Sequence, residues 1–195
     1  QSLLGPKDTQ KAITAAKRYI EDNLCRELNL IRVEVPLIVD AESGVNDYLD
    51  RDGSRGPVQF RIPNDRGAHA IDAQVVQAAT KWKRTALKQF EMAPGEGLIT
   101  DMRAVRKDYF LDHDHSAYVD QWDWEPAITA GERRLEFLKS TVQKIWGVIK
   151  GAEKHVQALF PALRRQYPDL RDTVTFLHAE DLLDRCPDLP RNGRE

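Results

Sequence analysis

One stretch of the chain decides the fold: Tyr118-Val119-Asp120-Gln121-Trp122-Asp123-Trp124-Glu125. Its side chains alternate in character, and those of a strand point alternately to two faces. If this stretch is a strand, one face carries Val119, Gln121, Asp123 and Glu125. The opposite face carries Tyr118, Asp120, Trp122 and Trp124. The first face carries an amide and two carboxylates, which suits the floor of a site for a small cationic or amine-bearing ligand. An ordinary solvated strand face is the alternative interpretation.

Further elements are predicted outward from this strand, which runs over 117–125. Another strand at 98–105 precedes it, and the polar loop between them is longer than a tight hairpin. Helical spacing predicts helices at 8–29, 76–90, 135–160 and 179–185, the first capped by Asp8 or Thr9. Alternation predicts strands at 30–35, 58–62 and 174–178. The predicted fold class is therefore α+β, with a mainly antiparallel sheet flanked by helices.

The composition describes a chain that can fold as one domain. Of its 195 residues 41% are hydrophobic, and domains of this size bury roughly 70% of the surface of the unfolded chain. The 29 basic and 31 acidic residues nearly balance, so no global field favours nucleic acid or an anionic membrane. Without a membrane-length apolar run or a secretory signal, a soluble, cytoplasmic protein is expected. The two cysteines lack the paired spacing of a metal site. Among the five histidines, His113 and His115 flank Asp114 in a way that could suggest a metal, but this pattern is more typical of a polar loop, so no metal ligand is predicted.

Three short motifs stand in a fixed order along the chain. They are Lys81-Trp82-Lys83-Arg84, then Gly95-Glu96-Gly97-Leu98 running on to Met102 and Arg106, then His115-Ser116 through Glu125. In this order and spacing the chain resembles the asparagine synthetase A family, the bacterial-type aspartate–ammonia ligases. That family is similar to the catalytic core of class II aminoacyl-tRNA synthetases. The resemblance therefore implies an antiparallel sheet that serves as a platform for ATP and an amino acid.

The resemblance covers nearly all of this chain but only part of the family's length. In the family a substantial C-terminal part follows, with further strands and a glycine-rich motif ending in an ATP-binding arginine. Residues 1–195 contain no such motif. We expect them to form a single synthetase-like catalytic domain that lacks its C-terminal part and is inactive by itself. Two explanations are open: the sequence is a fragment of a longer chain, or a second chain supplies the remainder.

The implied reaction is the ATP-dependent amidation of L-aspartate with ammonia to L-asparagine. It passes through an aspartyl-adenylate and releases AMP and pyrophosphate. Because the carboxylate of aspartate and the α-phosphate repel each other, the site needs fixed cations, ordinarily helped by Mg²⁺ across the phosphates. The implied cofactors are ATP and Mg²⁺. The implied partners are aspartate, ammonia, ATP and a second copy of the chain, in a homodimer that buries the first helix and its neighbouring strand.

Two cations are carried over from the resemblance. Arg106 matches the arginine of the second class II motif, which holds the α-phosphate bidentately. A surface arginine is the alternative. Lys83 is expected to contact a carboxylate of aspartate, although composition alone would place it on a solvated helix face. The neighbouring Lys81 and Arg84 are interpreted as surface residues.

Polar residues supply the remaining expected roles. Gln121 and Asp123 lie two apart on one strand face, about 7 Å along it, a spacing that can hold two ends of one amino acid. Gln121 is expected to donate to the carbonyl oxygen as it gains negative charge, and Asp123 to pair with the α-ammonium. Asp47 is a turn residue by composition. The resemblance assigns it to ammonium, as a local base that also holds the new amide.

The loop end before Tyr118 is the expected nucleotide contact. His115 and Ser116 match the family's approach to adenine and ribose. The class II motif usually reads Arg-x-Glu, whereas this chain has Arg106-Lys107-Asp108, which leaves the acidic contact near the adenine open.

Two other functions are open. A non-catalytic relative would bind an amino acid or a regulatory partner through the same fold, and the missing C-terminal motif favours it. An asparaginyl- or aspartyl-tRNA synthetase shares the sheet and the arginine. It also needs an anticodon-binding module or a basic surface, and the sequence shows neither.

Overall fold

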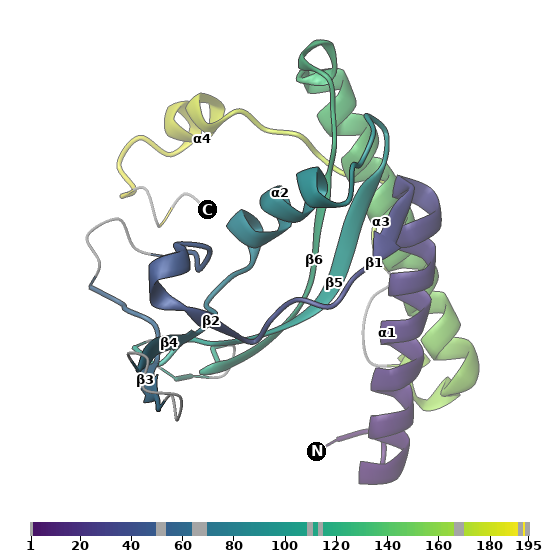
Figure 1. Ribbon diagram of the computed structural model, residues 1–195. Helices are drawn as coiled ribbons and strands as arrows, with labels where there is room; N and C mark the ends of the chain where they lie inside the picture. Colours follow the sequence, from purple (N-terminus) through teal and green to yellow (C-terminus); the bar gives the residue numbers. More distant parts are fainter. Residues whose placement is uncertain are drawn as a thin grey trace.

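The structure, a computed structural model, describes residues 2–49, 54–63, 70–108, 111–112, 115–165, 170–190 and 193. They form a central sheet with helices on both sides and a smaller sheet beside it (Figure 1). The central sheet has the order β1-β5-β6, from Leu30–Arg32, Gly97–Val105 and Tyr118–Pro126. The smaller sheet has the order β2-β4-β3, from Ile38–Asp40, Ile71–Val75 and Gln59–Ile62. The helices are α1 (Pro6–Leu28), α2 (Thr80–Gln89), α3 (Leu135–Leu159) and α4 (Ala179–Arg185).

The predicted α+β class is confirmed, and the pairing of β5 with β6 is its centre. The two strands run antiparallel in a register that joins Gly97 to Pro126 and Val105 to Tyr118. Partners directly across such a pair share a sheet face. Even-numbered residues of β5 therefore lie with odd-numbered residues of β6. Strand β1 pairs with the other side of β5 in parallel.

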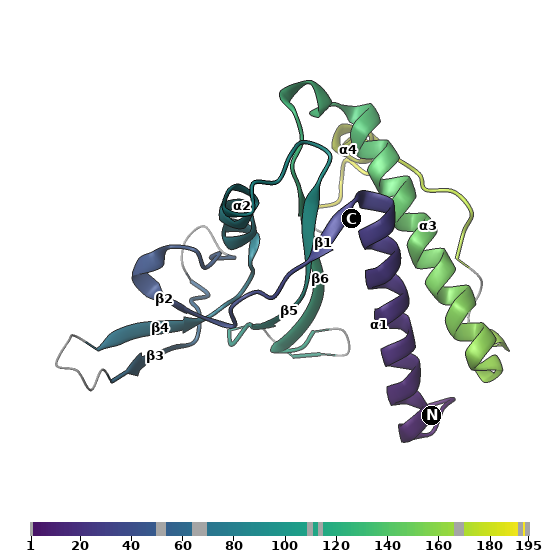
Figure 2. The same ribbon diagram turned by 45° about the vertical axis from the view of Figure 1, so that its right-hand side comes forward.

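Helices α1 and α3 lie side by side against one face of the central sheet, as Figure 1 and Figure 2 both show. Their contact with the sheet is a core of buried residues, with Trp122 and Trp124 packed against it: Leu24, Leu30, Ile99 and Val148. The tryptophans of β6 thus fill the interior on this face. The two helices approach so closely that Gly151 meets the ring of Tyr19, where a Cβ atom has no room.

Helix α2 lies against the opposite face of β5 and β6 (Figure 2). Ala79, Met102 and Ala104 form a second buried cluster there, and Val119 of β6 packs against it. The smaller sheet joins this side through Val76, whose N–H donates to the Leu37 carbonyl oxygen at 3.0 Å and whose own carbonyl oxygen accepts from Val105 at 3.2 Å. The chain between the two sheets is therefore held at the end of β5.

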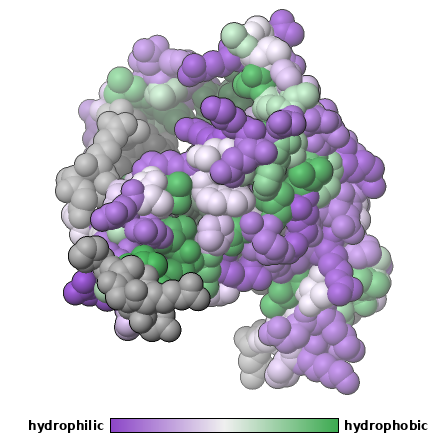
Figure 3. Space-filling view, in the orientation of Figure 1, coloured by the Kyte–Doolittle hydropathy of each residue, from purple (hydrophilic) through white to green (hydrophobic). Residues whose placement is uncertain are grey.

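Large hydrophobic side chains stay exposed on the smaller sheet, and Figure 3 shows hydrophobic surface in this part of the molecule, below α2. Four of them share one sheet face by their register and are 39% to 45% exposed: Ile38, Phe60, Ile62 and Ile71. Within the described ranges, no helix has an apolar stretch long enough to cross a bilayer.

Most predicted elements are confirmed within a few residues, the uncertainty usual at element ends. The helices predicted at 8–29, 135–160 and 179–185 and the strands at 98–105 and 117–125 appear as α1, α3, α4, β5 and β6. The strand predicted at 58–62 is β3, whereas the one at 30–35 is paired as strand only to Arg32. The helix predicted from residue 76 begins at Thr80, because Val76 still bonds to Leu37. Strands β2 and β4 are not predicted.

The capping prediction for α1 is wrong. The helix begins at Pro6 after Gly5, and no side chain caps it. Proline at the first turn lacks the N–H that a cap would satisfy. The Thr9 hydroxyl instead donates to the Gly5 carbonyl oxygen at 3.1 Å.

The strand predicted at 174–178 is also wrong. This segment is extended but pairs with no strand among the described residues. It runs beside α3, where the Trp146 indole N–H donates to the Arg171 carbonyl oxygen at 2.9 Å and Lys150 pairs with Asp172. Val174 lines an apolar groove beside this helix. Val174 therefore lies beside a helix instead of in a sheet, while Phe176 and Leu177 are exposed.

Charged side chains tie α1 to the central sheet. The Lys17 ammonium lies 2.8 Å from Asp101 and 2.9 Å from Asp120, and the Arg103 guanidinium lies 2.6 Å from Asp101 and 2.9 Å from Asp120. Burial of the Asp101 carboxyl group favours its neutral form, but hydrogen bonds from Arg103 and Lys17 outweigh burial and lower its pKa to about 2. The ionised form of Asp101 therefore stabilises the fold.

We predict that Gly97→Ala destabilises the sheet. A Cβ atom there would lie 2.7 Å from the Glu125 carbonyl oxygen and 2.7 Å from the Leu30 side chain, so strands β1 and β6 would have to shift. The expected loss in the free energy of unfolding is about 2 kcal/mol or more, measured by urea denaturation. Gly131→Ala is the matched control, because nothing lies within 4 Å of its added Cβ. Equal stability of the two variants would contradict this packing.

Asp101→Asn is expected to lower the free energy of unfolding at pH 7 by about 2 kcal/mol. Because the folded-state pKa of about 2 lies below the ordinary 3.8, the contribution is complete above pH 3.8 and is lost as the pH falls through 2. The variant should therefore lose less stability than the parent chain between pH 4 and pH 2. Asp8→Asn, in an exposed pair with Lys11, should change stability by less than about 1 kcal/mol. If the free energy of unfolding of the parent and of Asp101→Asn fell equally between pH 4 and pH 2, the stabilising role of ionised Asp101 would be refuted.

Candidate active site

The acidic face of β6 meets α2. Lys83 and Arg84 of the helix lie opposite Asp123 and Glu125 of the strand. The Arg84 Nε is 3.1 Å from Glu125 Oε1, and the Lys83 Nζ is 3.8 Å from Glu125 Oε2. Gln121 shares this face with Asp123, two residues earlier on β6. Three predicted site residues, Lys83, Gln121 and Asp123, therefore gather on one side of the sheet.

Lys83 is buried, with 1% of its surface exposed. Its ammonium group donates to the Asp123 carboxylate and, at 3.3 Å, to the Trp124 carbonyl oxygen. Glu125 lies nearby, so three acceptors surround the three N–H groups. A solvated helix face is therefore wrong for Lys83. The two residues predicted to hold the two ends of aspartate, Lys83 and Asp123, therefore contact each other.

Asp47 reaches the N-terminus of α2 from the loop that follows β2. Its Oδ2 accepts the backbone N–H of Lys81 at 3.1 Å. An acceptor there satisfies one of the free N–H groups of the first helical turn, and the helix dipole favours its negative charge. Since Lys83 follows Lys81 by two residues, α2 holds Asp47 and Lys83 in a fixed relation. The Asp47 carboxylate therefore stands in a loop and contacts helix α2.

Arg106 directly follows β5, and its backbone N–H donates to the Ala117 carbonyl oxygen at 2.8 Å. The pairing of β5 with β6 thus continues one residue beyond the strands. Met102 and Ala104 share the face of Gln121, and alternation along the chain carries Arg106 to the same face. Its side chain is half-buried. The structure therefore places Arg106 on the candidate side of the sheet, toward the far end of the strands.

His115 and Ser116 lie where the chain enters β6, and both are exposed. The His115 ring is 2.7 Å from an Asp112 carboxylate oxygen, and the Ser116 hydroxyl accepts the Tyr118 N–H at 3.3 Å. Seven or eight extended residues separate them from Asp123, roughly 25 Å of chain. They stand near Arg106 in the hairpin and away from the Lys83–Asp123 pair.

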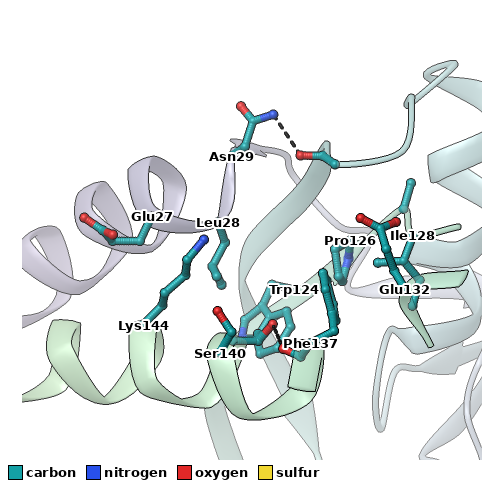
Figure 4. A pocket seen from close by; sticks show the side chains of 13 residues that line it. Glu27, Leu28, Asn29, Trp124, Pro126, Ile128, Glu132, Phe137, Ser140 and Lys144 are labelled. Carbon is teal, nitrogen blue, oxygen red and sulfur yellow. Dashed lines mark hydrogen bonds between the residues drawn. The ribbon is translucent and has the colours of Figure 1, made fainter. Parts of the chain in front are cut away.

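The cavity drawn in Figure 4, of about 190 Å³, is a different place. It lies between the C-terminal end of α1, the start of α3 and the end of β6, and Leu28, Trp124, Phe137 and Lys144 line it. Trp124 belongs to the opposite face of β6 from Asp123. The cavity is therefore not part of the candidate site.

Two contacts of the site are not predicted from the sequence. Lys81 and Arg84 are exposed, as expected, yet Lys81 binds Asp47 and Arg84 binds Glu125. Glu125 itself is predicted only as part of a polar face. Lys81, Arg84 and Glu125 all belong to the sequence motifs quoted above, and these motifs were the only indication in the sequence that the residues lie at the site. Their partners are more than 30 residues away in the chain, so the contacts follow only from the fold.

The arrangement suits a ligand that carries both charges. The Lys83 ammonium and the Arg84 guanidinium meet the carboxylates of Asp123 and Glu125, and the Gln121 amide and the Arg106 guanidinium lie farther along the same face. A zwitterion can exchange with the internal Lys83–Asp123 pair, and an anion can meet Arg106. In the described part of the chain, no three His, Cys, Asp or Glu side chains are grouped to hold a metal ion.

Solved structures support the fold. Asparaginyl-tRNA synthetase from Entamoeba histolytica, determined in complex with asparaginyl-adenylate, matches 93% of this chain and 36% of its own, with a TM-score of 0.54 and 12% sequence identity. At this identity the likeness concerns the fold alone. The central sheet with its flanking helices thus has the architecture of a class II aminoacyl-tRNA synthetase core.

Sequence relatives identify the family. The aspartate–ammonia ligase of Clostridium perfringens is 43% identical over 193 residues, which are 99% of this chain and 55% of that protein. The aspartate–ammonia ligase of Bacillus cereus is 39% identical over 195 residues, 57% of its length. The chain thus spans about half the length of these curated relatives. Because the profile of the aspartate–ammonia ligases matches residues 7–195, the chain belongs to the aspartate–ammonia ligase family.

Proposed function

We propose that the polypeptide containing this chain converts L-aspartate, ammonia and ATP into L-asparagine, AMP and pyrophosphate. One observation carries the proposal: Lys83 of α2 binds Asp123 on the acidic face of β6, and Asp47 accepts a backbone N–H of the same helix. Membership of the aspartate–ammonia ligase family supports the reaction class. Since the relatives are about twice as long, the proposal concerns the whole polypeptide, in which residues 1–195 form one synthetase-like catalytic domain.

Binding of aspartate is proposed to replace the internal ion pair. The α-ammonium takes the Asp123 carboxylate, and a substrate carboxylate takes the Lys83 ammonium. The charges at the site stay balanced through the exchange, so neither the buried Lys83 ammonium nor the half-buried Asp123 carboxylate is left without a counter-ion. A zwitterion meets this condition, whereas a ligand that lacks one of the two charges does not.

The first chemical step activates the side-chain carboxylate of aspartate. One carboxylate oxygen attacks the α-phosphorus of ATP, the bond to pyrophosphate breaks, and aspartyl-adenylate forms. Two anions meet in this step, so a fixed cation is needed where the negative charge accumulates. Arg106 is assigned that role, because a guanidinium group binds two phosphate oxygens and stays charged at all relevant pH.

The second step transfers ammonia. Asp47 is assigned to receive ammonium and accept one proton from it, which frees the nitrogen lone pair. Ammonia then attacks the activated carbonyl carbon, the bond to AMP breaks, and the attached nitrogen loses a further proton to solvent, which gives the amide of asparagine. Gln121 is assigned to donate to the carbonyl oxygen while that oxygen carries negative charge.

The nucleotide contacts of this chain are proposed at the far end of the hairpin. His115 and Ser116 are assigned to the adenine and ribose. Mg²⁺ across the phosphates of ATP belongs to the same proposal, and none of its ligands is assigned among the described residues of this chain. A homodimer that buries α1 and β1, and a cytoplasmic location, belong to the same proposal.

Aspartate-dependent exchange of labelled pyrophosphate into ATP by the complete polypeptide tests the function, because exchange needs only the first step. We expect Arg106→Ala to lower exchange by about a hundredfold or more. Asp47→Asn should keep exchange within about threefold while asparagine formation falls by about a hundredfold. Arg61→Ala, on the exposed face of β3, is the control and should leave both rates unchanged. A silent exchange reaction with Mg²⁺ present would refute the function, and equal loss of both steps would refute the role of Asp47.

Lys83→Met separates the structural and the binding role of this residue. It leaves the Asp123 and Glu125 carboxylates without the buried ammonium, so the free energy of unfolding should fall by about 3 kcal/mol. The KM for aspartate should rise in the complete polypeptide. The double variant Lys83→Met/Asp123→Asn should regain part of the stability but none of the affinity. Arg84→Met, at an exposed ion pair, should cost less than about 1 kcal/mol. Similar unfolding energies for Lys83→Met and Arg84→Met would contradict the buried pair.

A further inference from the structure

Asp47 lies between two neighbours whose side chains are fixed on the smaller sheet. Asn46 is 3% exposed, and its amide group donates to Gln74 Oε1 at 3.1 Å and to the Val75 carbonyl oxygen at 3.3 Å. Its Oδ1 accepts the Gln77 backbone N–H at 3.0 Å. Every polar atom of this side chain therefore has a partner, which fixes the backbone immediately before Asp47.

The residue after Asp47 is held by the same glutamine. Gln74 Nε2 donates to the Tyr48 hydroxyl at 3.2 Å, while Gln74 Oε1 accepts from Asn46. Gln74 is 2% exposed and lies on β4, between β2 and β3. One buried amide thus bridges the two residues that flank Asp47.

Helix α2 holds the loop from the other side. The Lys81 backbone N–H donates to Asp47, and the Lys81 ammonium donates to the Asn46 carbonyl oxygen at 3.1 Å. The same ammonium lies 5.7 Å from the centre of the Tyr48 ring. The side chains of Asn46 and Tyr48 therefore meet β4, while the carboxylate of Asp47 meets α2.

We propose that Gln74 is a positioning residue for the ammonia step, because its buried amide sets the direction in which the loop presents Asp47. The inference rests on the proposed function, in which Asp47 receives ammonium. Gln74 touches neither substrate nor nucleotide in this scheme, and it acts through Asn46 and Tyr48. A displacement of the Asp47 carboxylate by about 1 Å is enough to slow a positioned reaction by about a hundredfold.

A merely structural role would have a different signature. Lys83 binds Asp123, and both residues, like Arg106, belong to α2 and the β5–β6 pair and not to the smaller sheet, so aspartate activation is not expected to depend on the Gln74 amide. Loss of the amide should therefore affect the ammonia step and spare the first step. General loosening of the fold would slow both steps together.

The test uses Gln74→Met in the complete polypeptide. Methionine has a similar size but removes the acceptor for Asn46 and the donor to Tyr48. We expect the KM for ammonia to rise about tenfold or more, while aspartate-dependent pyrophosphate exchange stays within about twofold of the parent. Gln74→Glu keeps an acceptor for Asn46 and can accept from the Tyr48 hydroxyl, so it should restore most of the ammonia affinity.

The matched control is Gln59→Met, because Gln59 is the exposed cross-strand neighbour of Gln74 on β3. It should change neither step. Tyr48→Phe removes one hydroxyl group without disturbing the core. Like Gln74→Met, it should raise the KM for ammonia. An unchanged ammonia KM in Tyr48→Phe, or equal loss of exchange and ammonia transfer in Gln74→Met, would overturn the proposal. A parent polypeptide without exchange would refute the function itself and is a separate result.

Discussion

The antiparallel register of β5 with β6 is the constraint on which the rest of the structure depends. It joins Gly97 to Pro126 and Thr100 to Asp123, and it decides for both strands which side chains face α2 and which face α1 and α3. A shift by one residue would turn the tryptophans of β6 toward α2 and the carboxylates into the core. Such a shift is costly on both faces, because Trp122 and Trp124 pack with Leu24 and Ile99 while Asp123 meets a buried ammonium. The packing of the tryptophans and the Lys83–Asp123 contact therefore both stabilise the same register of β5 with β6.

Charge is balanced separately on the two faces of this strand pair. Lys83 and Arg84 face Asp123 and Glu125 on one side, and Lys17 and Arg103 face Asp101 and Asp120 on the other. Burial is distributed differently in the two sets: the side chains of Lys83 and Arg84 are 1% and 68% exposed, whereas those of Lys17 and Arg103 are 21% and 36% exposed. A buried pair contributes little net stability but makes the loss of one partner expensive. The proposed exchange of one ion pair for another concerns the face of Lys83 and Asp123, whereas the ion pairs on the opposite face attach α1 to the sheet.

Local patterns predicted what depends on local geometry. The alternation of Trp122 and Trp124 with Asp123 and Glu125 was enough to assign the two faces of β6, because side-chain direction in a strand follows from the backbone alone. Pairing is not local. Strand β4 is recognisable only between its partners β2 and β3, and 174–178 has strand composition without a partner strand among the described residues. In the same way Lys83 and Asp123 are 40 residues apart, and nothing in either motif says that they meet. The buried amides of Asn46 and Gln74 leave no periodic signal at all.

Asp123 and Asp47 lie in different kinds of structure, a strand and a loop, and both contact helix α2. Asp123 stands on a strand that is paired along its whole length, whereas Asp47 stands in a loop, where backbone position is ordinarily less well fixed. Lys83 contacts Asp123 through its side chain and Lys81 contacts Asp47 through its backbone N–H, so one helix links the two carboxylates. The helix alone would fix only the distance of Asp47, because a single hydrogen bond leaves the carboxylate free to swing. Its direction needs contacts on both flanks, and the buried amides on the smaller sheet supply them. The smaller sheet is therefore more than a support for the central one: it orients the one proposed catalytic carboxylate that the strand pair does not carry.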